Sequence, residues 1–135
     1  MVEFESDYLH IWIDEEINLM HSEWLRVVSS DEYRLGNCTF LTLLKKYSVK
    51  YWVVESSKLG DISEEDEKWT LTTLGPKIVQ SGVIKLARVV DEKQVSYNKF
   101  NTFSEKAPAI HMGKVEIRHF PTFKEAADWM GSIRS

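Results

Sequence analysis

Cysteine and long apolar runs are both scarce in this chain of 135 residues. Cys38 is the only cysteine, so no disulfide can form within the chain. No apolar run approaches the roughly 20 residues that a membrane-spanning helix needs. Residues 1–7 are acidic, whereas a signal peptide has a basic start and an apolar core. We therefore expect a cytoplasmic protein that is not integral to the membrane.

Clusters of basic residues are absent as well. The chain carries 17 Lys and Arg against 21 Asp and Glu, which gives a formal net charge of -4. Its densest charged run, residues 64–67, is wholly acidic. A protein that binds nucleic acid neutralises phosphates with a basic stripe. The sequence therefore predicts no nucleic-acid partner.

The motifs of common catalytic and metal sites are missing too. There is no Gly-x-Ser-x-Gly elbow, and the six glycines are dispersed rather than gathered in a phosphate-binding loop. The acidic run lacks the spacing of a calcium loop and suits the start of a helix. The four histidines, His10, His21, His111 and His119, show no zinc-site spacing. We expect no metal, no cofactor and no enzymatic activity.

What the sequence does contain is the composition of one globular domain spanning residues 1–135. Apolar residues make up 43% of the chain and charged residues 28%, as is ordinary for a folded domain. A domain of this size buries roughly two-thirds of its unfolded surface. It needs neither a disulfide nor a metal in order to fold.

Apolar spacing predicts a series of strands separated by helices. The predicted strands are residues 8–13 and 17–27, paired as an antiparallel hairpin, then 51–54, 85–91 and a last strand around Val115 and Ile117. The least regular segment, residues 92–112, allows a short helix through Val95, Phe100 and Phe103.

Capping residues predict where the helices begin. Ser29 and Glu32 form a capping box that opens a helix running to about Tyr47. Ser63 opens a second helix, and Thr122 with Glu125 opens a third.

Glycine and proline predict special points within these helices. Gly36 lies inside the first helix, which indicates close packing against a neighbour. The pair Gly75-Pro76 is expected to kink the second helix, because Pro76 lacks a backbone donor. Gly82 is expected to end that helix.

Strands that alternate with helices indicate parallel pairing through right-handed crossovers, and hence an α/β fold. We expect a mixed sheet of about five strands, with an N-terminal antiparallel hairpin and three to four helices.

Three segments resemble a known family: residues 51–69, residues 75–87, and residues 120–130. Together they resemble the STAS domains of anti-sigma-factor antagonists. More closely, they resemble the small STAS-like or SpoIIAA-like bacterial proteins, which are compared with CRAL-TRIO lipid-transfer domains. The resemblance implies a SpoIIAA/STAS-like β-α superhelix whose helices lie largely on one side of the sheet.

STAS antagonists carry a phosphorylatable serine in the loop after a central strand. Here residues 55–60, Glu-Ser-Ser-Lys-Leu-Gly, occupy that place with Glu and Lys substituted into the motif. The resemblance implies a phosphoacceptor or docking loop formed by Ser56, Ser57, Leu59, Gly60 and Asp61. The alternative is that these residues only make local turn bonds.

The first predicted strand suggests a second surface. If Leu9, Ile11 and Ile13 face the helices, then Tyr8, His10 and Trp12 face the other side. An aromatic face of this kind suits a ligand or a homodimer. The alternative is that a terminal segment or residues 92–112 cover it.

Three functional hypotheses follow. The first is a non-enzymatic STAS-like module that regulates through contacts with a protein partner, in which a homodimer is one option. The second is a small carrier or sensor for an apolar or amphipathic, lipid-like ligand. The third is an enzyme that gathers carboxylates or histidines from several strand ends.

Overall fold

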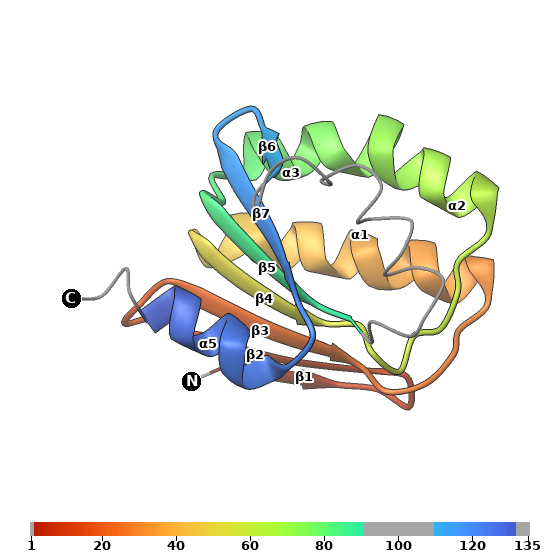
Figure 1. Ribbon diagram of the computed structural model, residues 1–135, viewed down its shortest axis with the longest axis horizontal. Coiled ribbons are helices and arrows are strands. Elements are labelled where there is room, and N and C mark those ends of the chain that lie inside the picture. Colours follow the sequence, from red (N-terminus) through yellow and green to blue (C-terminus); the bar gives the residue numbers. More distant parts are fainter. Residues whose placement is uncertain (1, 91–109, 132–135) are drawn as a thin grey trace.

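A computed structural model describes the backbone of residues 2–90 and 110–131 (Figure 1). It has seven strands in the order β1-β2-β3-β4-β5-β7-β6. The strands are β1 (Val2–Glu5), β2 (Leu9–Asp14), β3 (Leu19–Trp24), β4 (Tyr51–Glu55), β5 (Lys85–Val89), β6 (Ile110–Met112) and β7 (Val115–Phe120). The helical segments are α1 (Ser30–Lys46), α2 (Glu64–Trp69), the π-helical η1 (Thr70–Leu74), α3 (Gly75–Ser81) and α5 (Phe123–Gly131).

The pairing confirms an α/β fold with a mixed sheet. Strands β3, β4, β5 and β7 run parallel, and β2 pairs with β3 as the expected antiparallel hairpin. The expectation of about five strands was too low, because β1 and β6 add an antiparallel strand at each edge. These two strands have only four and three residues, too few for a clear period. The helix expected within residues 92–112 falls largely on residues outside the described part.

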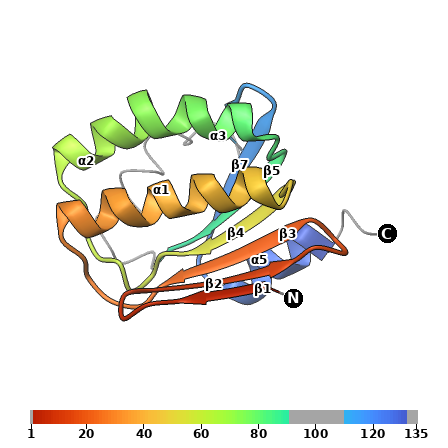
Figure 2. The ribbon, with the colours of Figure 1, turned by 180° about the vertical axis from the view of Figure 1, so that it is seen from behind.

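The helices lie on both faces of the sheet. Helix α1 and the continuous segment α2-η1-α3 lie side by side over one face, while α5 lies on the other (Figures 1 and 2). The larger core lies beneath α1 and α3, and a smaller one joins α5 to the sheet through Val53, Ala87, Val89, Ala126 and Met130. Helix α5 therefore departs from the one-sided arrangement that the resemblance implied.

The predicted caps are present at the helix starts. The Ser29 hydroxyl accepts from Glu32 N and the Glu32 carboxylate accepts from Ser29 N, which completes the capping box. The Ser63 hydroxyl accepts from Asp66 N, and that of Thr122 accepts from Glu125 N at 3.2 Å. Gly82 follows α3 with φ of 100°, a left-handed conformation that glycine adopts without strain.

Gly36 marks a close contact between α1 and the sheet. A Cβ atom at this position would lie 2.6 Å from Cη2 of Trp24 on β3. The Trp24 ring is 2% exposed and contacts the rings of Tyr8, Tyr33 and Phe40. The close packing expected at Gly36 is thus confirmed, since only a residue without a side chain leaves room for the indole.

We predict that Gly36→Ala destabilises the protein by about 1 kcal/mol. Alanine gains about 1 kcal/mol in helix propensity, but overpacking a core costs typically 1–3 kcal/mol. Urea denaturation measures the difference. Gly131→Ala is the matched control, because a Cβ there has nothing within 4 Å. A Gly36→Ala protein at least as stable as the wild type would contradict the prediction.

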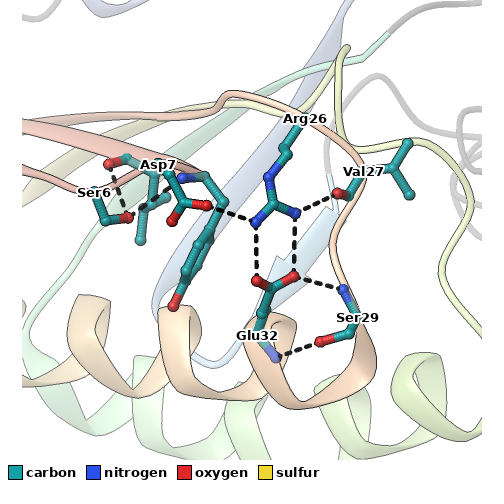
Figure 3. A network of polar contacts seen from close by, with 8 residues as sticks. Ser6, Asp7, Arg26, Val27, Ser29 and Glu32 are labelled. Atoms are coloured by element: carbon teal, nitrogen blue, oxygen red, sulfur yellow. Dashed lines mark hydrogen bonds and ion pairs between the residues drawn. The ribbon is translucent and has the colours of Figure 1, made fainter.

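Arg26 joins the hairpin to the start of α1 (Figure 3). Its guanidinium donates to both carboxylate oxygens of Glu32, at 3.1 and 2.9 Å, and to Asp7 Oδ2 at 3.0 Å. It also donates to the Val27 carbonyl. The hydrogen bonds from Arg26, followed by that from the Ser29 backbone, lower the pKa of Glu32 from 4.5 to about 2.

The depressed pKa predicts acid sensitivity at this junction. The Glu32 pair contributes stability above pH 4.5, the unfolded value, and that contribution is lost as the pH falls toward 2. Urea midpoints measured across this range should therefore fall less steeply for Glu32→Gln than for the wild type. Glu15→Gln, an exposed carboxylate in the β2–β3 turn, should keep the wild-type slope. Equal slopes for Glu32→Gln and the wild type would refute the assignment.

Candidate functional site

A cavity of about 350 Å³ lies between the helix-facing side of the sheet and the segment α2-η1-α3. Strands β3, β4, β5 and β7 supply one wall, while α1, η1 and α3 supply the other. The lining residues are mostly apolar: Trp24, Trp52, Val54, Leu59, Leu71, Leu74, Gly75, Ile78, Leu86 and Ile117. The polar lining residues are Tyr33, Asn37, Ser56, Thr70, Arg88 and His119.

The π-helical turn η1 forms part of the cavity wall, and the sequence explains its position. Gly75 N donates to Thr70 O, five residues back, which is the π-helical pattern. Pro76 follows directly and has no N–H to donate. The kink expected at Gly75-Pro76 thus takes the form of a widened turn just before it. Isolated π turns are frequent at functional sites.

Arg88 is the charged residue in this apolar wall. It lies on β5, opposite Val54 of β4 and His119 of β7. Its side chain is half-buried, and its Nη1 atom is shielded from solvent. Burial lowers the pKa of Arg88 to about 10, so the guanidinium keeps its charge at neutral pH.

His119 is the neighbour of Arg88 in the sheet, and it is neutral. Burial, and after it the charge of Arg88, lower the pKa of His119 to about 3. At neutral pH its imidazole therefore offers one donor and one acceptor without a charge.

Tyr33 brings a hydroxyl from α1 to the cavity. The Thr70 hydroxyl donates its single proton to Asp66 O at 2.7 Å, so Tyr33 Oη donates to Thr70 Oγ1, also at 2.7 Å. Burial raises the pKa of Tyr33, and the phenol stays protonated. Asn37 Nδ2 donates to the Tyr33 carbonyl one turn back.

Asp66 ties the two helices over the cavity together. Its carboxylate is buried and accepts from Ser30 Oγ at 2.8 Å and from Arg34 Nε at 3.0 Å, both on α1. The acidic run that suits a helix start therefore also contains an interhelical ion pair. Such a partnered buried charge is costly to disrupt.

The loop predicted as phosphoacceptor or docking segment points partly inward. Ser56 is 3% exposed and Leu59 is 4% exposed, and both line the cavity. The Ser57 hydroxyl contacts the Glu55 carboxylate, a charge that disfavours phosphate at this position. Gly60 is half-buried and Asp61 is exposed. Phosphorylation of Ser56 or Ser57 stays a prediction, and Ser57 is the more accessible of the two.

The predicted face of Tyr8, His10 and Trp12 is not formed as expected. Tyr8 lies on the helix side, where its ring stacks on Trp24 at 6.3 Å. The alternation was extrapolated to Tyr8, but β2 begins only at Leu9. His10 and Trp12 do share the opposite face, with ring centroids 3.7 Å apart.

On that opposite face the aromatic contacts continue toward α5. The Trp12 ring stacks on His21, and His21 stacks on Phe123, the first residue of α5. Burial lowers the pKa of His21. Edge strand β1 brings Glu3 and Glu5 within 3.4 and 3.3 Å of the His10 ring nitrogens. Helix α5 thus covers part of this face, in agreement with the alternative that a terminal segment covers it.

In residues 2–90 and 110–131, no group of three or more His, Cys, Asp or Glu side chains is placed to hold a metal ion. Within the same part of the chain, no helix has both the length and the apolar character needed to cross a membrane.

Arg88 and His119 were not assigned to a site from the sequence. One signal was available in the sequence. Arg88 interrupts the apolar run Leu86-Ala87-Arg88-Val89-Val90, where burying a charge costs free energy unless the charge is paired or hydrogen-bonded. His119 becomes informative only through its pairing with Arg88 in the sheet.

Comparisons of the chain with protein-family models, with curated proteins and with solved structures find no match.

Proposed function

We propose that the chain is a non-enzymatic, STAS-like binding module that holds a small amphipathic molecule in the cavity beneath η1. The observation that carries the proposal is a cavity of about 350 Å³ whose wall is mostly apolar yet contains Arg88. Ligand pockets measure roughly 300–1,000 Å³ and combine apolar walls with a few polar groups. The STAS-like kinship is supported by consecutive parallel strands with α1 and α3 on one face, whereas α5 departs from it.

Apolar contact with a short alkyl chain supplies only part of the affinity of a ligand. A ligand that buries about eight methylene groups gains roughly 6 kcal/mol, before the cost of association. Micromolar binding requires about 8 kcal/mol. Apolar burial therefore falls short by itself, and a polar contact with the wall has to contribute.

The lining residues favour binding over catalysis. Among the described residues that line the cavity, the titratable side chains are Tyr33, Arg88 and His119. At neutral pH these are a protonated phenol, a guanidinium and a neutral imidazole. These three groups do not form a nucleophile paired with a general base, which favours a carrier or sensor role.

We predict that Leu71→Trp weakens ligand binding about tenfold. Leu71 lines the cavity although 50% of its side chain is exposed, so a larger ring at the rim narrows the entrance. Leu35→Trp is the matched control, since Leu35 is an exposed helical leucine outside the cavity. Thermal-shift titration with straight-chain carboxylates and alcohols, together with native mass spectrometry, supplies the readout. Equal ligand affinities of the Leu71→Trp and Leu35→Trp variants would place the ligand outside this cavity.

A second proposal is docking of a regulatory protein at the loop of residues 56–61. It is favoured by Val27, an apolar side chain that is 63% exposed and lies beside Gly60. We predict that Val27→Glu and Asp61→Lys each abolish retention of a partner that co-purifies with the wild type. Leu35→Glu, at another exposed position of α1, should retain it. Retention by all three variants would rule out this surface.

A further inference from the structure

Ser56 contributes a buried hydroxyl to the wall of the cavity. It directly follows Glu55, the last residue of β4, and is 3% exposed. Side chains alternate along an extended chain, so Ser56 projects from the same face as Trp52 and Val54. All three residues line the cavity. The hydroxyl therefore belongs to the cavity wall rather than to the outer surface of the loop.

Backbone hydrogen bonds hold Ser56 in this position. Its N–H donates to Val89 O at 2.7 Å, which continues the pairing of β4 with β5, and its carbonyl accepts from Leu59 N at 3.1 Å. In the described part of the chain these two backbone contacts are the hydrogen bonds of Ser56, and its hydroxyl makes none. Buried hydroxyls are as a rule hydrogen-bonded. We therefore expect the partner of this hydroxyl inside the cavity.

The other polar residues of the wall interact with groups of the protein. Tyr33 donates to Thr70, and Asn37 donates to the Tyr33 carbonyl. Arg88 and His119 each interact with other groups of the chain. A ligand can therefore bond to the hydroxyl at the end of β4 without displacing a hydrogen bond between described residues.

A lone serine hydroxyl suits a neutral head group that both donates and accepts. It carries one proton and two lone pairs, and the proton turns to suit its partner. An alcohol meets either orientation, whereas an ammonium only donates and a carboxylate only accepts. A charged head group would also exchange its hydration for a single hydrogen bond to this hydroxyl, which is costly.

We propose that Ser56 is the specificity-determining residue of the cavity. The ligand is a neutral amphiphile of the aliphatic-alcohol class, with its hydroxyl on Ser56 Oγ and its apolar chain against Leu74 and Leu86. This inference rests on the proposed function, because it assigns the polar end of a ligand already placed in the cavity. The head group then lies at the carboxyl end of β4, the end of a parallel strand at which ligands bind in open α/β sheets.

The test is a cycle of two ligands and two proteins. Octanol and octyl chloride share one alkyl chain, and only octanol has a hydroxyl, while Ser56→Ala removes the hydroxyl from the protein. Displacement of the neutral fluorescent dye N-phenylnaphthylamine measures each affinity. Ser56→Ala should weaken octanol binding about fivefold, which is the loss of one neutral hydrogen bond, and leave octyl chloride binding unchanged. Each ligand is compared with itself, so the different hydration of the two ligands cancels.

Ser57→Ala is the matched control, because Ser57 is the neighbouring serine and is not among the residues that line the cavity. It should bind both ligands like the wild type, and circular dichroism verifies that both variants are folded. A second measurement needs no variant protein. Nuclear Overhauser contacts of octanol with the wild-type chain should join the methylene group next to the octanol hydroxyl to the β protons of Ser56. Contacts of Ser56 with the terminal methyl group instead would overturn the assignment.

The outcomes separate the inference from the function on which it rests. If Ser56→Ala weakens octanol and octyl chloride equally, or weakens neither, the role of Ser56 is overturned while the cavity remains a binding site. Octanoate that binds the wild type more tightly than octanol would overturn the alcohol class. Failure of the dye and of all three octyl ligands to bind would reject the proposed function itself.

Discussion

The packing of the Trp24 indole against Gly36 determines how α1 lies on the sheet. Three other rings, those of Tyr8, Tyr33 and Phe40, contact the indole, so one buried side chain organises β3, α1 and the start of β2. The same indole lines the cavity. Trp24 therefore contributes both to the close packing of α1 on the sheet and to the wall of the cavity.

The parts of the fold that could be predicted are those encoded locally. The capping residues Ser29 and Ser63 and the helix end at Gly82 each act within a few positions of the chain. The edge strands β1 and β6 could not be predicted, because short segments become strands only by pairing with a neighbour. Tertiary contacts likewise determine the side of the sheet on which α5 packs and the inward position of Tyr8.

The candidate site depended even more on tertiary structure. Ser56 and Leu59 were predicted as parts of a loop with an external role, but the loop turns both side chains inward. Arg88 and His119 are 31 positions apart in numbering and meet only because β5 and β7 pair in this register. Periodicity locates apolar faces, whereas the convergence of polar groups requires the order and register of the strands.

The two edges of the sheet have a consequence for the behaviour of the protein in concentrated solution. An unpaired strand edge invites pairing with another molecule, and natural proteins counter this with short, charged edge strands. Strand β1 has four residues, two of which are Glu3 and Glu5, and β6 at the other edge has three. Joining two copies through β1 would bring four carboxylates together on adjacent strands. Repulsion between these carboxylates disfavours the addition of further copies along this edge.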